Sequence, residues 1–125
     1  MAKAPYVQYS VADKNGELIH TFDPKLTSPS MMHDFAITEN FSIIMDLPLR
    51  FDPRRSVKGQ AMLYFNAQEK SKFGVFDRLC NAAETVKWFT ADTCYIFHTA
   101  NAWEHDRKVE ENIYFFFVEK YLLWK

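Results

Sequence analysis

The chain has 125 residues, a length that fits one ordinary domain or a piece of a larger one. Hydrophobic residues make up 48% and aromatic residues 17% of it, which excludes a disordered segment. The 15 basic and 16 acidic side chains leave a net charge of -1, so there is no basic footprint for nucleic acid and we expect no nucleic-acid partner.

Cysteine usage and hydropathy indicate the cellular setting. Cys80 and Cys94 match no zinc motif and are too few for a disulfide framework. The first ten residues lack the apolar stretch of a signal peptide, and the aromatic run at 113–118 is too short to span a bilayer. These features predict a cytoplasmic protein.

The first predicted strands form a hairpin. Residues 6–12 and 17–22 are strand-like, and Asn15-Gly16 between them is a typical tight-turn signal. Residues 23–30 contain two prolines and are predicted to form a loop.

A second strand pair is expected at 31–37 and 41–47, with its turn at 38–40. Residues 48–59 are then a polar connector. Residues 80–88 have room for a short helix or turn. The remaining predicted strands are 61–66 paired with 73–77, then 86–89, 94–100 and 113–118.

Many short strands, tight turns and little helix predict an antiparallel all-β architecture. A sandwich, a barrel and a propeller all satisfy this description. No short repeat in the sequence selects the propeller by its spacing.

Two of the four histidines, His33 and His98, lie in predicted strands among apolar residues. Alternation along a strand gives each an apolar face. The neighbours expected on that face are Met31, Phe35 and Ile37 for His33, and Cys94 and Ile96 for His98. His20 and His105 are expected at the surface, because one precedes a loop and the other lies in a charged cluster.

A histidine on an apolar face needs a partner, because burying either ring nitrogen unpaired costs about 1–3 kcal/mol. A backbone carbonyl or a carboxylate satisfies it, and so does a metal ion. The residues alone leave both alternatives open. Asp34 points to the opposite face from His33, and we expect it to be a sheet-edge or turn residue and not the orienting partner of His33.

Four motifs in order carry a family resemblance: "MMHDFAITENF", "IIMDLPL", "KFGVF" followed by Arg78, and "CYIFHTANAWE". Together they resemble the carotenoid cleavage dioxygenases, most closely the plant cytosolic type that cleaves carotenoids and apocarotenoids at the 9,10(9′,10′) bonds. The likeness runs from about Pro5 to Glu104. Since enzymes of this family are several times longer, the chain resembles an internal fragment of one.

The resemblance implies part of a seven-bladed β-propeller with Fe(II) on its axis, held by histidines alone. His33 in "MHDF" matches one ligand position. His98 matches another, through the His-x-x-Asn-x-x-Glu pattern that includes Asn101 and Glu104. The other two of the four ligand histidines, and the glutamates that orient three of the four, lie outside this chain.

The implied activity is oxidative cleavage of a polyene double bond by O₂, with a carotenoid or apocarotenoid as substrate and an aldehyde or ketone as product. Phe35, Phe97 and Trp103 lie near the matched ligands in sequence and are expected to pack in the core or to line the substrate tunnel. With only two ligands, the isolated chain is expected to be inactive.

Residues 1–104 are therefore predicted to be a partial propeller segment, and 105–125 a divergent tail that keeps only a charged-then-apolar outline. Two alternatives stay open. One is a non-catalytic remnant, and the other is a small β-rich interaction module whose aromatic tail docks on a partner or makes peripheral contact with a membrane.

Overall fold

The structure, a computed structural model, describes residues 3–79, 85–105 and 108–114, with side chains only as far as residue 104. Its elements in chain order are β1 (Tyr9–Ala12), β2 (Leu18–Phe22), β3 (Ala36–Ile37), β4 (Phe41–Asp46), β5 (Leu49–Phe51), the 3₁₀ helix η1 (Pro53–Lys58), β6 (Leu63–Phe65), β7 (Ser71–Asp77), β8 (Lys87–Ala91), β9 (His98–His105) and β10 (Lys108–Tyr114). Apart from η1 and the single 3₁₀ residue Thr85, those ranges contain no helical residues, which confirms the predicted all-β class.

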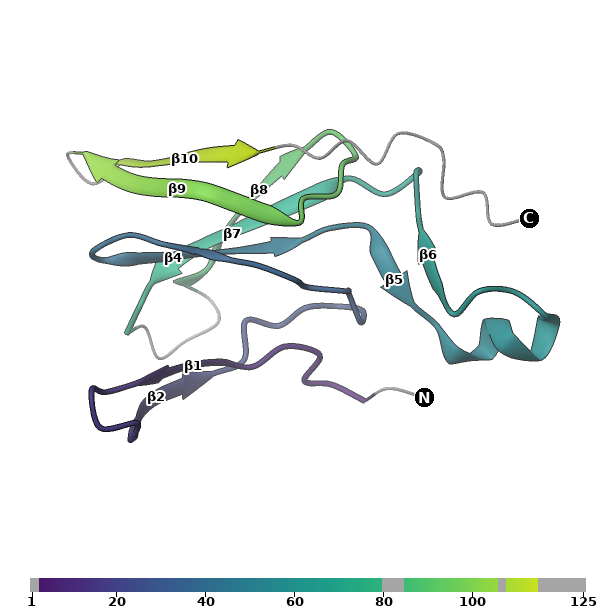
Figure 1. Ribbon diagram of the computed structural model, residues 1–125, viewed down its shortest axis with the longest axis horizontal. Helices are drawn as coiled ribbons and strands as arrows, with labels where there is room; N and C mark the ends of the chain where they lie inside the picture. The colour runs from purple at the N-terminus through teal and green to yellow at the C-terminus, as the bar shows by residue number, and fades with distance from the viewer. Residues whose placement is uncertain (1–2, 80–84, 106–107, 115–125) are drawn as a thin grey trace.

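The largest sheet has four antiparallel strands in the order β3-β4-β7-β8 (Figure 1). Gly74 of β7 pairs with Trp88 of β8. A Cβ at Gly74 would lie 2.9 Å from the Trp88 ring, so the ring can cover β7 only because this position is glycine. A four-stranded antiparallel sheet has the strand number and direction of a propeller blade.

Strand β4 is buried on both faces, because its run of apolar residues supplies two separate cores. Ile44 and Phe76 face the β1–β2 hairpin and pack with its aromatic rings, Tyr9 and Phe22. Met45 faces the other way. It packs in the second core with Leu47, Leu49, Tyr95 and Ile96.

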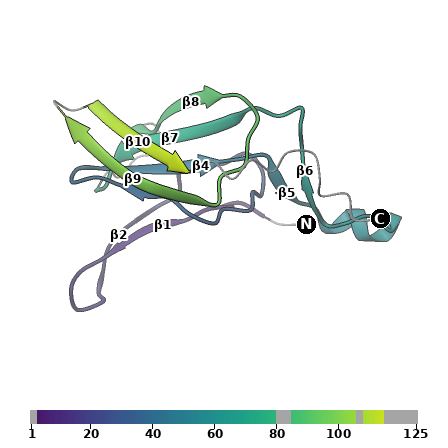
Figure 2. The same cartoon turned by 45° about the horizontal axis from the view of Figure 1, so that its top comes forward.

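Three two-stranded hairpins surround this sheet: β1–β2, β5–β6 and β9–β10. Figure 2 shows β1–β2 on one side of the sheet and β9–β10 on the other, where β9 contacts β3. The predicted turn at Asn15-Gly16 is confirmed, since Gly16 has φ +85° and Asp13 caps the turn by accepting from the N–H groups of Asn15 and Glu17.

One predicted connector and one predicted strand pairing are wrong. Residues 48–59 are not simply a connector, because they contain β5, and β6 pairs with β5 and not with β7. Strand β7 pairs instead with β4 and β8. Strand β5 was not predicted because the charged Arg50 lies in its middle and is atypical of a buried strand. In the fold Arg50 is 5% exposed, and its guanidinium donates to Asp46 at 2.6 Å and also to Glu69.

Two predicted strands begin later than expected. Residues 31–35 are extended but lie outside any ladder, because Met31 and Phe35 find other partners: the Met31 N–H donates to Leu49, and the Phe35 N–H donates to the Asp34 carboxylate. Residues 94–97 also precede their strand, since the Cys94 N–H donates to the Ser71 hydroxyl.

Strand β8 begins one residue later than predicted, and β10 overlaps the predicted last strand at 113–114. The helix or turn predicted within 80–88 falls mostly on residues 80–84, outside the described residues. Among the described residues there is no helix with the length and apolar character that a membrane crossing requires.

Candidate metal centre

The fold brings His33 and His98 together, although 65 positions separate them in the sequence (98 − 33). Their ring centroids lie 5.1 Å apart, with an angle of 74° between the ring planes. Phe97 contacts the His33 ring edge-on at 5.7 Å. The two histidines selected by the sequence therefore meet at one place in the described fold.

Hydrogen bonds and packing hold the segment that carries His33. The Tyr95 hydroxyl donates to the Met31 carbonyl at 3.1 Å, and the Met31 N–H donates to the Leu49 carbonyl at 2.8 Å. Tyr95 is itself buried in the second core. The chain just before His33 is thus anchored to a rigid part of the fold.

Asp34 joins the two histidine segments directly. Its Oδ2 accepts from the N–H of Thr99 at 2.8 Å and from the hydroxyl of the same residue at 3.1 Å, while Oδ1 accepts from the Phe35 N–H. Partial burial acts to raise the pKa of Asp34, but the bonds from Thr99 and Phe35 outweigh it and leave this pKa below its usual value. In the described part of the chain, the Asp34 carboxylate makes no hydrogen bond with His33, in agreement with the sequence argument.

Glu104 joins the same segments at the far end of β9. Its Oε2 accepts from the Thr38 hydroxyl at 2.6 Å, and its Oε1 accepts from the Asn40 side chain. These hydrogen bonds, the bond from Thr38 first, lower the pKa of Glu104. Asn101, the middle residue of the matched pattern, is exposed.

The sequence missed the partners of both carboxylates. Each accepts hydrogen bonds from residues 64 to 66 positions away, and no local pattern marks such a pair. Glu104 attracted notice only through the family pattern. Thr38 is a polar residue in the turn between two apolar strands, and this is a weak signal that could have suggested its hydrogen bond to Glu104.

The predicted alternation around His33 is present even without a ladder. Residues 31, 33, 35 and 37 are exposed and residues 32, 34, 36 and 38 are half-buried or buried. The apolar residues Met31, Phe35 and Ile37 are 44%, 49% and 48% exposed, so they form an uncovered apolar face beside the His33 ring.

For His98 the predicted face is wrong. Ile96 is 1% exposed and belongs to the second core, whereas His98 is exposed, because the strand begins only at His98. Phe97 and Trp103, each 37% exposed, join Phe35 outside the buried core, so core packing does not hold for these three within the described chain.

The two imidazoles fit a shared metal ion. With a metal–nitrogen bond of about 2.1 Å, each ring centroid lies roughly 3 Å from the ion, so rings on one ion have centroids at most about 6 Å apart. The observed 5.1 Å satisfies this limit. No hydrogen bond or ion pair within the described residues engages either ring.

Two imidazoles are an incomplete set. Among the side chains that the structure describes, no group of three or more histidine, cysteine, aspartate or glutamate residues gathers at one place. Neutral imidazoles are suitable ligands for Fe(II), but two of them leave most of the coordination sphere to groups outside this chain.

The other two histidines do not join the pair. His20 is half-buried and not fully at the surface as predicted, since it packs against the rings of Tyr9 and Phe22, with its Nε2 buried and without a hydrogen-bond partner. The side chain of His105 falls outside the described part of the chain.

A separate pocket of about 380 Å³ lies beside β5, away from the histidines. Its charged lining is already paired, Arg50 with Glu69 and Arg54 with Asp52. Its lining also includes Tyr6, Pro29, Phe51 and Tyr64. It therefore offers weaker ligand chemistry than the histidine pair.

Comparison with known proteins agrees with the geometry. A sequence profile of the family described as "Retinal pigment epithelial membrane protein" matches residues 1–120. The chain is 44% identical over 107 residues to a carotenoid 9,10(9′,10′)-cleavage dioxygenase 1 of Pisum sativum, covering 85% of this chain and 20% of that protein. It is 45% identical over 106 residues to a carotenoid 9,10(9′,10′)-cleavage dioxygenase of Crocus sativus, covering 84% of this chain and 19% of that protein.

A solved structure shows the same fold. The lignostilbene dioxygenase of Pseudomonas brassicacearum superposes with a TM-score of 0.73 at 29% identity, over 82% of this chain and 21% of that one. The chain thus spans about a fifth of the length of the proteins that it matches. Its all-β sheet and hairpins are one segment of their β-propeller. The profile match and the shared fold show that the chain belongs to the carotenoid oxygenase family, as a partial chain related to carotenoid cleavage dioxygenases.

Proposed function

We propose that this chain is a segment of an Fe(II)-dependent dioxygenase that cleaves a carotenoid or apocarotenoid at the 9,10(9′,10′) double bonds, with O₂ as co-substrate. The observation that carries the proposal is the 5.1 Å approach of His33 and His98 in a fold shared with carbon–carbon-cleaving dioxygenases. The similarity to 9,10(9′,10′)-cleaving relatives supports this bond as the target.

His33 and His98 would hold the iron as neutral nitrogen ligands, together with histidines supplied from outside this chain. When bound, the iron supplies the O₂ chemistry, and the protein supplies orientation and exclusion of water. The anchoring bonds at Met31 and Asp34 hold the chain on both sides of His33 before any ligand binds.

The exposed apolar face beside His33 suits a polyene. Phe97 packs against the His33 ring, and Phe35 presents a half-exposed ring two residues further along. An apolar substrate that covers these rings gains by their removal from water, and its double bond then lies beside the histidine pair.

We expect the isolated chain to be inactive, because two ligands bind iron far less tightly than a complete preorganised set. A cytoplasmic location stays a prediction. Membrane or partner docking also stays a prediction, since the aromatic tail lies outside the described residues. No observation in the described residues favours the interaction module over the dioxygenase segment.

A chimera tests the proposal. The matched segment of the Pisum sativum enzyme is replaced by its counterpart from this chain, and cleavage of an apocarotenoid is followed by chromatography of the products. We expect the chimera to cleave the substrate. The His33→Ala and His98→Ala chimeras should each lose cleavage, and the matched control His20→Ala should keep it. Full activity in either of the first two variants would refute the assignment.

A further inference from the structure

Strand β9 lies against the segment that carries His33 without a backbone ladder between them. β9 pairs with β10, whereas β3 pairs with β4, in a different sheet. In the described ranges, the hydrogen bonds between residues 31–41 and β9 all involve the carboxylates of Asp34 and Glu104. Side chains therefore hold β9 in this position.

One contact lies at the histidine end. Asp34 follows His33 and accepts two hydrogen bonds from Thr99, the residue that follows His98. Each bond donor and acceptor is thus one residue from a histidine. We therefore expect a change in this contact to shift the backbone at both histidines.

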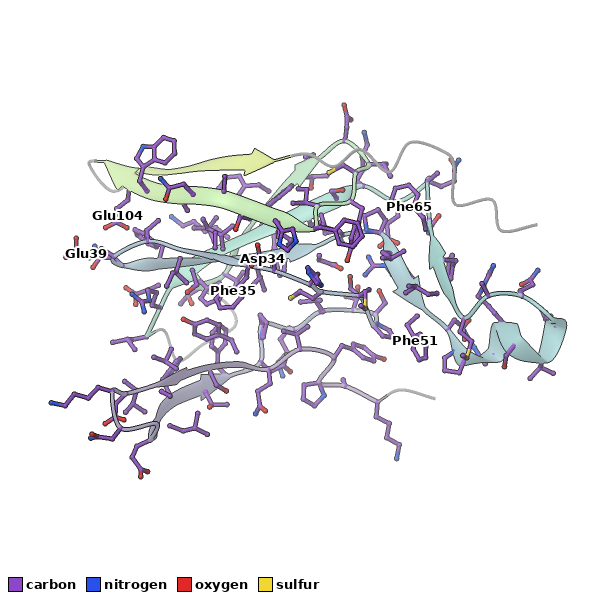
Figure 3. All side chains as sticks on the ribbon, viewed as in Figure 1. Asp34, Phe35, Glu39, Phe51, Phe65 and Glu104 are labelled. Atoms are coloured by element: carbon purple, nitrogen blue, oxygen red, sulfur yellow. The ribbon has the colours of Figure 1, made fainter. Side chains whose placement is uncertain are left out.

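The second contact lies at the other end of β9, as Figure 3 shows for the labelled Asp34 and Glu104. Glu104 accepts from the hydroxyl of Thr38, from the Asn40 side chain and, at 3.4 Å, from the Asn40 N–H. Thr99 and Glu104 are five residues apart, or roughly 16 Å along a strand. A single contact would allow β9 to pivot about it, whereas two contacts at different points of the strand do not. The Asp34 and Glu104 contacts together therefore fix the direction of β9 as well as its position.

We propose that Asp34 and Glu104 are positioning residues that fasten β9 to residues 34–40 at two points and so set the spacing of His33 and His98. This extends the proposed function, because the spacing matters for a shared metal ion. The two-point attachment itself depends only on the hydrogen bonds and can be tested without metal.

The first test uses Cu(II)–iminodiacetate as the probe, since this chelate leaves positions that two adjacent imidazoles can fill. Binding to the 125-residue chain is measured by calorimetry, and nitrogen coordination by electron paramagnetic resonance. We expect Asp34→Ala and Glu104→Ala each to weaken binding roughly 10- to 100-fold, the range found when groups that orient metal ligands are removed.

Conservative and distant variants separate positioning from general stability. Asp34→Asn and Glu104→Gln keep an oxygen that accepts from Thr99 and Thr38, and they should retain binding within a few-fold of the original chain. Asp13→Ala, which removes a carboxylate that caps the distant β1–β2 turn, should leave binding unchanged.

The second test is free of metal and measures hydrogen exchange of backbone N–H groups. In Asp34→Ala the Thr99 N–H should exchange faster, while the N–H of Ile44 in the central sheet keeps its rate. If the alanine variants do not fold, Thr99→Val replaces Asp34→Ala and Thr38→Val replaces Glu104→Ala, because each removes the hydroxyl that donates to the carboxylate. Thr38→Val also removes the acceptor of the Phe41 N–H.

The outcomes distinguish this inference from the proposed function. If the original chain binds the probe no more tightly than His33→Ala does, the shared metal site fails. Faster Thr99 exchange in Asp34→Ala still supports the attachment in that case. Unchanged Thr99 exchange overturns the attachment, and so does unchanged probe affinity in both alanine variants of a chain that binds the probe through both histidines.

Discussion

Replacing Arg50 by methionine removes the cation from a network of charged side chains behind the histidine segment. Arg50 lies on β5, and its backbone forms an isolated antiparallel β-bridge with Ser30, the residue just before Met31. Its guanidinium donates to Asp46 at 2.6 Å and twice to Glu69. The side chains of Arg50 and Asp46 are 6% and 4% exposed, so the substitution leaves Asp46 as a buried, uncompensated carboxylate.

The expected loss follows from that burial. Two unit charges in contact, roughly 4 Å between centres, interact by about 4 kcal/mol at an effective dielectric constant of ~20. Removing one partner of a buried ion pair costs about 3–5 kcal/mol in measured cases. The lost interaction with Glu69 adds less to the destabilisation, because the Glu69 side chain is 29% exposed and water replaces part of that interaction. We therefore expect Arg50→Met to lower the free energy of unfolding by about 3–5 kcal/mol.

Urea denaturation followed by tryptophan fluorescence measures this loss. Arg54→Met is the matched control, because its ion pair with Asp52 is at the surface, and its loss of unfolding free energy should be clearly smaller than that of Arg50→Met. The double variant Arg50→Met/Asp46→Asn should recover part of the stability, since it removes the stranded charge. A loss in Arg50→Met no larger than in Arg54→Met would refute the reasoning.

Three further predictions concern pH and packing. Hydrogen bonds from Arg50 lower the pKa of Glu69 from its usual 4.5. The contribution of Glu69 to stability is therefore complete above pH 4.5 and is lost as the pH falls through the lowered pKa of the folded state. In urea titrations at several pH values, Arg50→Met should flatten this acid dependence of the unfolding free energy. The side chain of Arg54 lowers the pKa of Asp52 to about 2, and Arg54→Met should return it toward 3.8 in an NMR titration; an unchanged value would contradict the assigned cause. Phe76→Ala should cost about 3–5 kcal/mol of unfolding free energy, because the ring is 2% exposed; a loss below 1 kcal/mol would show that this core is loosely packed.

Local signals in the sequence were sufficient for part of the fold. Asn15-Gly16 marks a hairpin by the conformations that these residues accept, and the structure has the turn there. The alternation around His33 also has a local cause, the extended backbone, and it survives without a ladder. Such features depend on neighbours in the chain and can be read from it.

Features that depend on distant partners could not be predicted. The sequence of β5 reads as a polar connector because the partners of Arg50 are 4 and 19 residues away. The late start of β9 depends on Ser71, which lies 23 residues before Cys94. The bonds that Glu104 accepts are similarly non-local.

The candidate site was found by resemblance more than by pattern. Residues alone left His33 and His98 as either satisfied strand histidines or metal ligands. The family motifs selected the second alternative, and the fold then brought the two rings within 5.1 Å. Their exposure could not have been predicted, because strand periodicity indicates an apolar face and not whether this length of chain covers it.

The most direct test of the account is anomalous diffraction at the cobalt edge from crystals of the chimera grown with Co(II). The account predicts one cobalt peak bonded to both His33 and His98. A peak that contacts only one of these rings, or lies away from both, would contradict the claim that the two histidines share a metal ion.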